Sequence, residues 1–246
     1  MRCWTFILIT LLFAACSQNN VTEDNSFKKY FDSAGVSGTF GMFDNGQGHF
    51  TIYNLPRFRD SVYLPAGTFD LILSLIGIQT GLVKDDSALA VLGREDGFSQ
   101  LALHLGKDTL KKWIDSLGYG NKNIGGPIDS FWLNNHLKVT PDEQLGLVKK
   151  LYFDQLPFFQ HTQQVVRRQM MTENNTNYLL SYKTGRGTKE NGQSIAWVLG
   201  WIEENKHPYF FVLNLESTSP NGDILNTGLP ILKSILTQMG FFQGKK

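Results

Sequence analysis

The sequence predicts an α/β fold of the α+β kind, with a central antiparallel sheet flanked by helices and an all-helical lobe beside it. Strand-forming runs lie near both ends of the chain, an apolar helix is expected over residues 69–78, and the patterns over about 84–171 are mostly helical. Because strands from both ends of the chain must share one sheet, the helical segment between them is expected to form a separate lobe.

Residues 1–16 are predicted to be a lipoprotein signal peptide. Arg2 supplies a positive charge, residues 4–15 are apolar, and small residues precede Cys16. This pattern resembles a bacterial lipobox, in which Cys16 would carry the lipid, and an ordinary secretory signal is the alternative. The polar residues 17–26 predict a flexible tether. The remaining domain, 27–246, is therefore expected in the bacterial cell envelope, anchored by lipid, with the outer membrane favoured and the domain facing the periplasm or the exterior.

The first elements of the domain are predicted to be a short helix and a β-hairpin. The helix is expected over residues 27–33. Two β-prone runs follow at 37–43 and 49–53, and the glycine-rich stretch 44–48 between them predicts a turn. This hairpin can begin a sheet.

The segment 69–78 is apolar around almost its whole circumference. A helix without a wide polar face is normally buried, and this one is shorter than the roughly 20 residues that cross a membrane. Thr68 is expected to cap its start, and Gly81 to end it in the left-handed conformation. Asp70 falls in its first turn, where the simple explanation is that an acid stabilises a helix N-terminus.

The middle of the chain predicts three further helices. Apolar residues recur at helical spacing over 101–117. Thr140, Pro141 and Glu143 form a helix start with a capping box, which leads into a helix that reaches residue 152. The next helix is expected over 163–171.

The last third predicts strands and a closing helix. The strands are expected at 177–182, 194–202 and 209–215. The short connection 203–208 predicts that the last two strands pair antiparallel. An amphipathic helix over 229–238 closes the domain.

Four motifs occur in an informative order: Pro65-Ala66-Gly67-Thr68-Phe69-Asp70 with Ser74-Leu75-Ile76-Gly77 and Thr80-Gly81, then Tyr119-Gly120-Asn121, then Phe131-Trp132-Leu133, then Lys183-Thr184-Gly185. Together they resemble the class D (oxacillinase-type) serine β-lactamases and the related penicillin-binding transpeptidase domains. The resemblance covers about residues 35–242 and implies a β-lactamase/transpeptidase-like fold.

The resemblance places the family's catalytic residues on positions where this chain has others. The nucleophilic serine falls on Gly67, the lysine general base on Asp70, and the serine of a Ser-x-Val motif on Gly93. The family's late arginine, which holds the substrate carboxylate, has no counterpart, since no arginine follows Arg186. The bulky Arg94 next to Gly93 is a candidate, with Glu95, for filling the cleft.

The positions that bind ligand in the family are better preserved. The resemblance implies ligand binding by Lys183, Thr184 and Gly185, with Trp132 and Tyr119 beside them. We expect Asp70 to form an ion pair with Lys183 across the cleft, because an acid buried alone would cost several kcal/mol.

The sequence therefore predicts a catalytically inactive member of this group that binds cell-wall peptide, a β-lactam or a protein partner in the former active-site cleft. An acyl-enzyme needs an activated nucleophile, a base and an oxyanion hole together, and two of these are lost. The alternative is a divergent β-lactamase in which Asp70 activates water. A structural or sensory module that acts through a separate envelope protein is a third hypothesis.

Composition excludes other classes of function. Basic and acidic residues number 23 and 22, so nothing indicates nucleic acid as a partner. The five histidines are widely spaced, and no phosphate-binding glycine loop is present. We expect neither a metal nor an organic cofactor.

Overall fold

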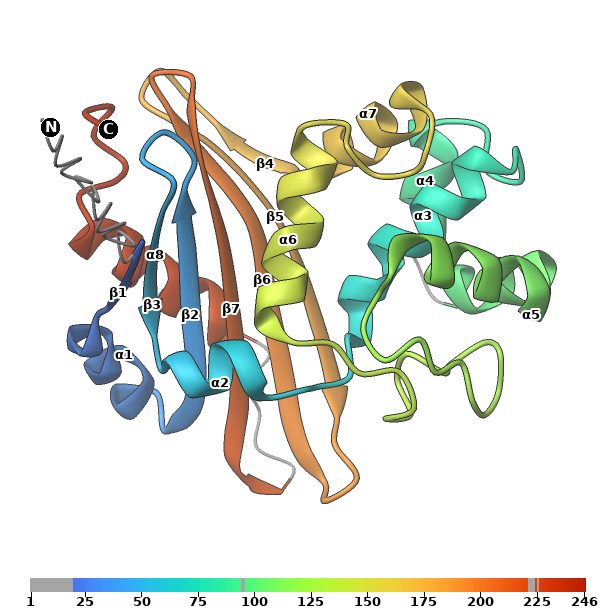
Figure 1. Cartoon of the computed structure of the whole chain (residues 1–246), viewed down its shortest axis with the longest axis horizontal. Coiled ribbons are helices and arrows are strands. Elements are labelled where there is room, and N and C mark those ends of the chain that lie inside the picture. Colours follow the sequence, from blue (N-terminus) through green and yellow to red (C-terminus); the bar gives the residue numbers. More distant parts are fainter. Residues whose placement is uncertain (1–19, 94–95, 221–223, 225) are drawn as a thin grey trace, which may run out of the picture.

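The computed structural model describes residues 20–93, 96–220, 224 and 226–246. A seven-stranded sheet crosses the molecule in the order β1-β3-β2-β7-β6-β5-β4 (Figure 1). Its strands are β1 (Val21–Glu23), β2 (Val36–Asp44), β3 (His49–Tyr53), β4 (Met171–Asn174), β5 (Leu179–Thr188), β6 (Gln193–Glu204) and β7 (His207–Pro220). Neighbouring strands are antiparallel except for the parallel pair β1 and β3. The predicted sheet, built from both ends of the chain, is confirmed.

Helices cover both faces of this sheet (Figure 1). On one face lie α1 (Lys28–Ser33) and α8 (Gly228–Gln238), which pack against β2, β6 and β7. The others are α2 (Leu55–Asp60), α3 (Asp70–Gln79), α4 (Asp86–Leu92), α5 (Gly97–Leu117), α6 (Pro141–Tyr152) and α7 (Gln160–Gln169). Within the described residues, no helix has the length and apolar character needed to cross a bilayer.

The helical lobe predicted over 84–171 needs one correction. Helix α6 packs against β2, β6 and β7, so it belongs to the cover of the sheet (Figure 1). Its buried residues include Leu145, Val148 and Leu151, which follow one another at intervals of three residues and so lie on one face. The predicted capping box is confirmed, because Thr140 accepts from the backbone of Glu143 and the Glu143 carboxylate accepts from the backbone of Thr140.

Both predicted hairpins are confirmed. Strands β2 and β3 pair antiparallel up to Asp44 and His49. Strands β6 and β7 are joined by Asn205 and Lys206, whose φ angles are 51° and 65°. Two positive φ angles define the tight hairpin turn whose twist matches that of the strands, which explains the antiparallel pairing.

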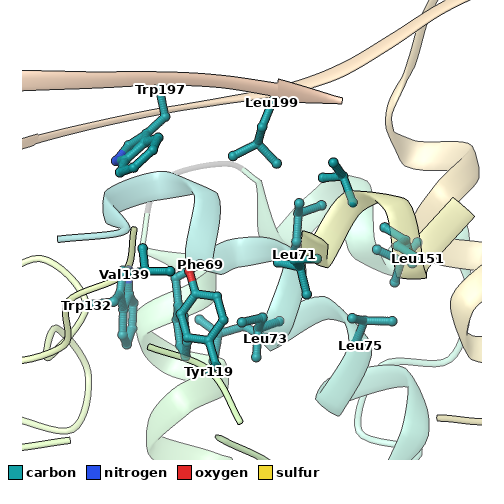
Figure 2. Close-up of a cluster of buried hydrophobic side chains, with 14 of the residues drawn as sticks. Phe69, Leu71, Leu73, Leu75, Tyr119, Trp132, Val139, Leu151, Trp197 and Leu199 are labelled. Atoms are coloured by element: carbon teal, nitrogen blue, oxygen red, sulfur yellow. The ribbon is translucent and has the colours of Figure 1, made fainter. Parts of the chain in front are cut away.

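Helix α3 is buried, as predicted. Every residue from Leu71 to Gly77 is buried. Figure 2 shows Trp197 and Leu199 of β6 above the helix, with Phe69 packed near its start. Each fully buried leucine or isoleucine contributes roughly 1.5–3 kcal/mol of transfer free energy, so α3 is a main source of stability for the site it carries.

The start of α3 differs from the prediction, whereas its end agrees with it. A 3-10 turn, η2 (Ala66–Phe69), precedes the helix. The Thr68 hydroxyl donates to the carbonyl of Pro65 and does not cap α3, so that prediction is wrong. Gly81 has a φ of 76° and follows the last turn, as predicted.

The short edge strands β1 and β4 were not predicted. Strand β1 lies inside the expected tether 17–26, which is wrong for residues 21–26, since 25–27 also form a 3-10 turn. The predicted helix 163–171 instead begins at Gln160 and ends at Gln169. The signal peptide with Cys16 lies outside the described residues.

Candidate functional site

The candidate site lies along the edge of β5 where β4 no longer covers it. Strand β4 pairs with β5 only from Leu179 to Ser181. Beyond that point the η2 turn lies against β5. Gly185 makes this close approach possible, because a Cβ there would lie 2.5 Å from the backbone nitrogen of Thr68. The lack of a side chain at Gly185 therefore brings Gly67 beside the Lys183-Thr184-Gly185 motif.

This motif lies within a strand. Strand β5 continues to Thr188, and Lys183, Thr184 and Gly185 pair with Leu199, Val198 and Trp197 of β6. The sequence predicted that the motif follows the end of the strand, which is wrong. Because β6 continues to pair with β5 as far as Thr188, the glycine-rich segment stays in the sheet and the motif lies within the strand.

A cavity of about 400 Å³ opens at this edge. Six of the predicted site residues are in its wall: Gly67, Asp70, Gly93, Trp132, Thr184 and Gly185. Lys183 lines a smaller adjoining cavity of about 150 Å³, whose wall also includes Asp70 and Gly93. The fold thus collects residues from four separate parts of the chain around one space.

Asp70 and Lys183 form the predicted ion pair. The Lys183 Nζ lies 2.9 Å from the Asp70 Oδ2, and the side chains are 29% and 20% exposed. Burial raises the pKa of Asp70, while the charge of Lys183 and its hydrogen bond oppose the rise. A salt bridge therefore occupies the point at which the resemblance places a lysine base.

Gly67 leaves room where the resemblance places a nucleophilic serine. A Cβ at Gly67 would lie 3.3 Å from the Cα of Gly185, so a side chain fits with a shift of a few tenths of an ångström. The neighbouring hydroxyl of Thr68 cannot take the role, because it is fully buried, donates to Pro65 and accepts from Gln144. The space is present, but the attacking oxygen is absent from it.

Trp132 supports the site from behind. Its ring stacks on Phe69 with centroids 5.4 Å apart, and its carbonyl accepts from the backbone N–H of Ala66. Ala66 has a φ of 52°, which is uncommon for a residue with a side chain. The Trp132 contacts therefore help to hold the η2 turn in a conformation that orients Gly67.

Tyr119 does not reach the cavity, which corrects its prediction as a ligand-binding residue. The side chain is 4% exposed and packs against Phe69 in the core (Figure 2). Burial raises the pKa of its hydroxyl well above the ordinary value, with Thr68 and Gln144 nearby. Its position indicates a packing role beneath the site.

Gly93 is in the wall of both cavities, close to Asp70, as expected from the motif position it occupies. Arg94 and Glu95, the candidates for filling the cleft, lie outside the described residues. Among the residues that the structure describes, no group of three or more histidine, cysteine, aspartate or glutamate side chains is arranged to hold a metal ion.

Sequence reasoning missed Arg186 and Phe98 as residues of the cavity wall. The Phe98 ring lies 5.8 Å from the Lys183 Nζ, a cation–π contact that α5 supplies. Strand alternation could have predicted Arg186 as a wall residue. Because β5 extends to Thr188, the side chain of Arg186 lies on the same face of the strand as that of Thr184. The predicted strand ended at residue 182, so Arg186 was not expected to lie on it.

Comparison with known proteins gives a consistent picture. The family described as penicillin binding protein transpeptidase domain matches residues 94–237. The chain is 28% identical to Beta-lactamase OXA-19 of Pseudomonas aeruginosa, over 97% of this chain and 96% of that protein. It is similar to the class D β-lactamase FUS-1 of Fusobacterium nucleatum, with a TM-score of 0.82, 27% identity, and coverage of 90% and 100%. The C-terminal domain of the Bacillus licheniformis BlaR penicillin-receptor shares the fold, with a TM-score of 0.81, 23% identity, and coverage of 92% and 98%.

Proposed function

Since this chain belongs to the family of penicillin-binding protein transpeptidase domains, with the class D β-lactamase fold that its motifs predicted, we propose that it binds a β-lactam or a cell-wall peptide without acylation. The protein acts as a receptor or scavenger in the old active-site cleft and is not a serine hydrolase. Its relatives include β-lactamases and a penicillin receptor. The comparison is therefore compatible both with hydrolysis of a bound ligand and with binding alone.

The salt bridge between Asp70 and Lys183 carries this proposal. In acyl transfer, a base must accept the proton of an attacking hydroxyl. Here the group at the base position is a carboxylate that accepts a hydrogen bond from Lys183 at 2.9 Å, and Gly67 presents no hydroxyl to it. The cavity nevertheless remains open at about 400 Å³, the size of a small-molecule site.

The location of the protein is part of the proposal. The lipobox-like residues before Cys16 support a lipid anchor in the cell envelope, with the domain facing the periplasm or the exterior. In the sensory form of the proposal, a separate envelope protein relays the binding signal. Labelled palmitate should enter the wild type and not the Cys16→Ala variant. Equal labelling of both would remove the anchor from the proposal.

Equilibrium binding with recovery of the ligand tests the function. Wild-type domain is incubated with benzylpenicillin, the bound fraction is measured by calorimetry, and the ligand is then recovered and analysed. The proposal predicts saturable binding and intact penicillin. Penicilloic acid that accumulates in proportion to protein concentration would show hydrolysis and overturn it.

One observation favours a second function, direct hydrolysis by water. The Asp70 carboxylate lines the cavity, and burial raises its pKa, which suits a general base. In that case Asp70→Asn would abolish turnover while leaving binding in place. Absence of turnover in the wild type removes this candidate.

A further inference from the structure

The charged groups around the cavity are not all paired. Asp70 and Lys183 neutralise each other. Arg186 also lines the cavity, and among the described residues its guanidinium has no ion pair and no hydrogen bond. By contrast, Arg57, Arg167 and Arg168 each lie within 3.5 Å of an acid. An arginine left unpaired in a cavity wall is available to an anionic ligand.

The β5 strand presents Arg186 and Thr184 together. Side chains alternate along a strand, so these two share the face opposite Lys183, which points to Asp70. Their cross-strand partners in β6 are Ala196 and Val198, which are apolar and line the same cavity. At one end of the cavity, therefore, the Arg186 guanidinium and the Thr184 hydroxyl lie next to the apolar residues Ala196 and Val198.

Among the described residues, β6 and α8 bring no acid to this end of the cavity. Gly228, at the start of α8, lines it, and a Cβ there would lie 2.9 Å from Val198. The two acids among the described residues of the wall are Asp70 and Asp96, which come from α3 and from the residue before α5. Both acids come from the helical side of the cavity, whereas β6 and α8 contribute apolar residues and a glycine to its wall.

We propose that Arg186, with Thr184, binds the carboxylate of the ligand and so decides which ligands the cleft accepts. The guanidinium offers two parallel N–H donors that match a carboxylate, and the Thr184 hydroxyl supplies a third donor. Arg186 thereby replaces the late arginine that the chain lacks. This inference rests on the proposed function, because it needs a ligand in the cavity.

The test compares benzylpenicillin with its methyl ester, which has the same shape but no carboxylate. Charge-assisted hydrogen bonds of this kind are worth roughly 10- to 100-fold in affinity. Wild-type protein should bind the acid at least tenfold more tightly than the ester. Arg186→Gln should weaken the acid to the level of the ester and leave the ester unchanged, whereas Arg186→Lys should recover part of the difference.

Arg59→Gln is the matched control, since Arg59 is an exposed arginine of α2 that does not line the cavity. It should bind both compounds as the wild type does, and thermal unfolding of each variant checks its folding. Equal affinity of Arg186→Gln and wild type for the acid would overturn the inference alone, as would equal weakening of acid and ester. If neither compound binds the wild type, the proposed function fails and the inference with it.

Discussion

Lys183 of β5 and Asp70 of α3 meet at 2.9 Å across the candidate site, where they join the sheet to the first turn of the buried helix. The two residues were expected to pair because an acid buried alone would cost several kcal/mol. The ion pair places the Lys183 ammonium group in contact with the Asp70 carboxylate. Asp70 lines both the larger and the smaller cavity, and Lys183 lines the smaller one.

The two members of this pair should respond unequally to removal. Asp70→Asn should cost less than about 1 kcal/mol of unfolding free energy, because burial already disfavours the carboxylate, while Lys183→Met should cost roughly 1–3 kcal/mol by leaving that carboxylate unpaired. Urea unfolding of both single variants and the double variant gives the coupling energy, expected at roughly 1–2 kcal/mol. Strict additivity would contradict the pairing.

The stability contributed by Asp70 should depend on pH in one direction. Its pKa is raised by burial, so the folded state holds the proton more tightly than the unfolded state. Relative to Asp70→Asn, the wild type should be most stable below the ordinary pKa of 3.8, and should lose that advantage as pH rises through the folded-state pKa. Chemical unfolding of both proteins between acid and neutral pH measures this, and a difference that grows with pH would contradict it.

Gly185 should be intolerant of a side chain. A Cβ would lie 2.5 Å from the Thr68 nitrogen, so β5 and η2 must separate, at a cost of roughly 1–3 kcal/mol. Gly146→Ala in α6 is the control, because nothing lies within 4 Å of a Cβ there and alanine favours a helix. Thermal unfolding should show Gly185→Ala destabilised and Gly146→Ala unchanged or stabilised; equal behaviour would refute the close approach.

A second charged cluster, whose residues are not part of the cavity wall, should matter for stability. The Glu216 carboxylate is 10% exposed and bonds Arg57 at 3.1 Å and also Lys189. Burial alone would raise its pKa, but Lys189 and Arg57 hold the pKa below its usual value. Glu216→Gln should therefore cost roughly 3 kcal/mol at neutral pH, since it leaves two cations without their acid.

The pH dependence of that cost follows from the lowered pKa. The stability from Glu216 is present above the ordinary value of 4.5 and is lost as pH falls through the folded-state pKa, so the variant and the wild type should converge in acid. Denaturant midpoints at neutral and acid pH provide the measurement. If the difference in stability between Glu216→Gln and the wild type did not change with pH, the effect would come from packing and not from the charge of Glu216.

Local signals in the sequence predicted most of the fold. The capping box at Thr140 and the antiparallel pairing of β6 with β7 across a short connection depend on neighbouring residues, and both were predicted from them. The short strands β1 and β4 were missed because three or four residues carry too little alternation, and pairing with β3 and β5 alone defines them.

The parts of the site that escaped prediction depend on contacts distant in sequence. Thr68 was expected to cap α3, but Gln144 and Pro65 engage its hydroxyl. Tyr119 was assigned to ligand binding through the resemblance alone, and packing against Phe69 buries it. One signal was overlooked: Glu216 directly follows the apolar run of β7, and an acid in that place needs a basic partner.

Intact-mass spectrometry after incubation with benzylpenicillin tests the central claim, which is that this cleft binds without acylation. The double substitution Gly67→Ser with Asp70→Lys runs in parallel, because the space at Gly67 accepts a Cβ 3.3 Å from Gly185. We predict an unchanged mass for the wild type and a penicilloyl adduct on the double variant. An adduct on the wild type would contradict the account, since it would reveal a nucleophile in the cleft.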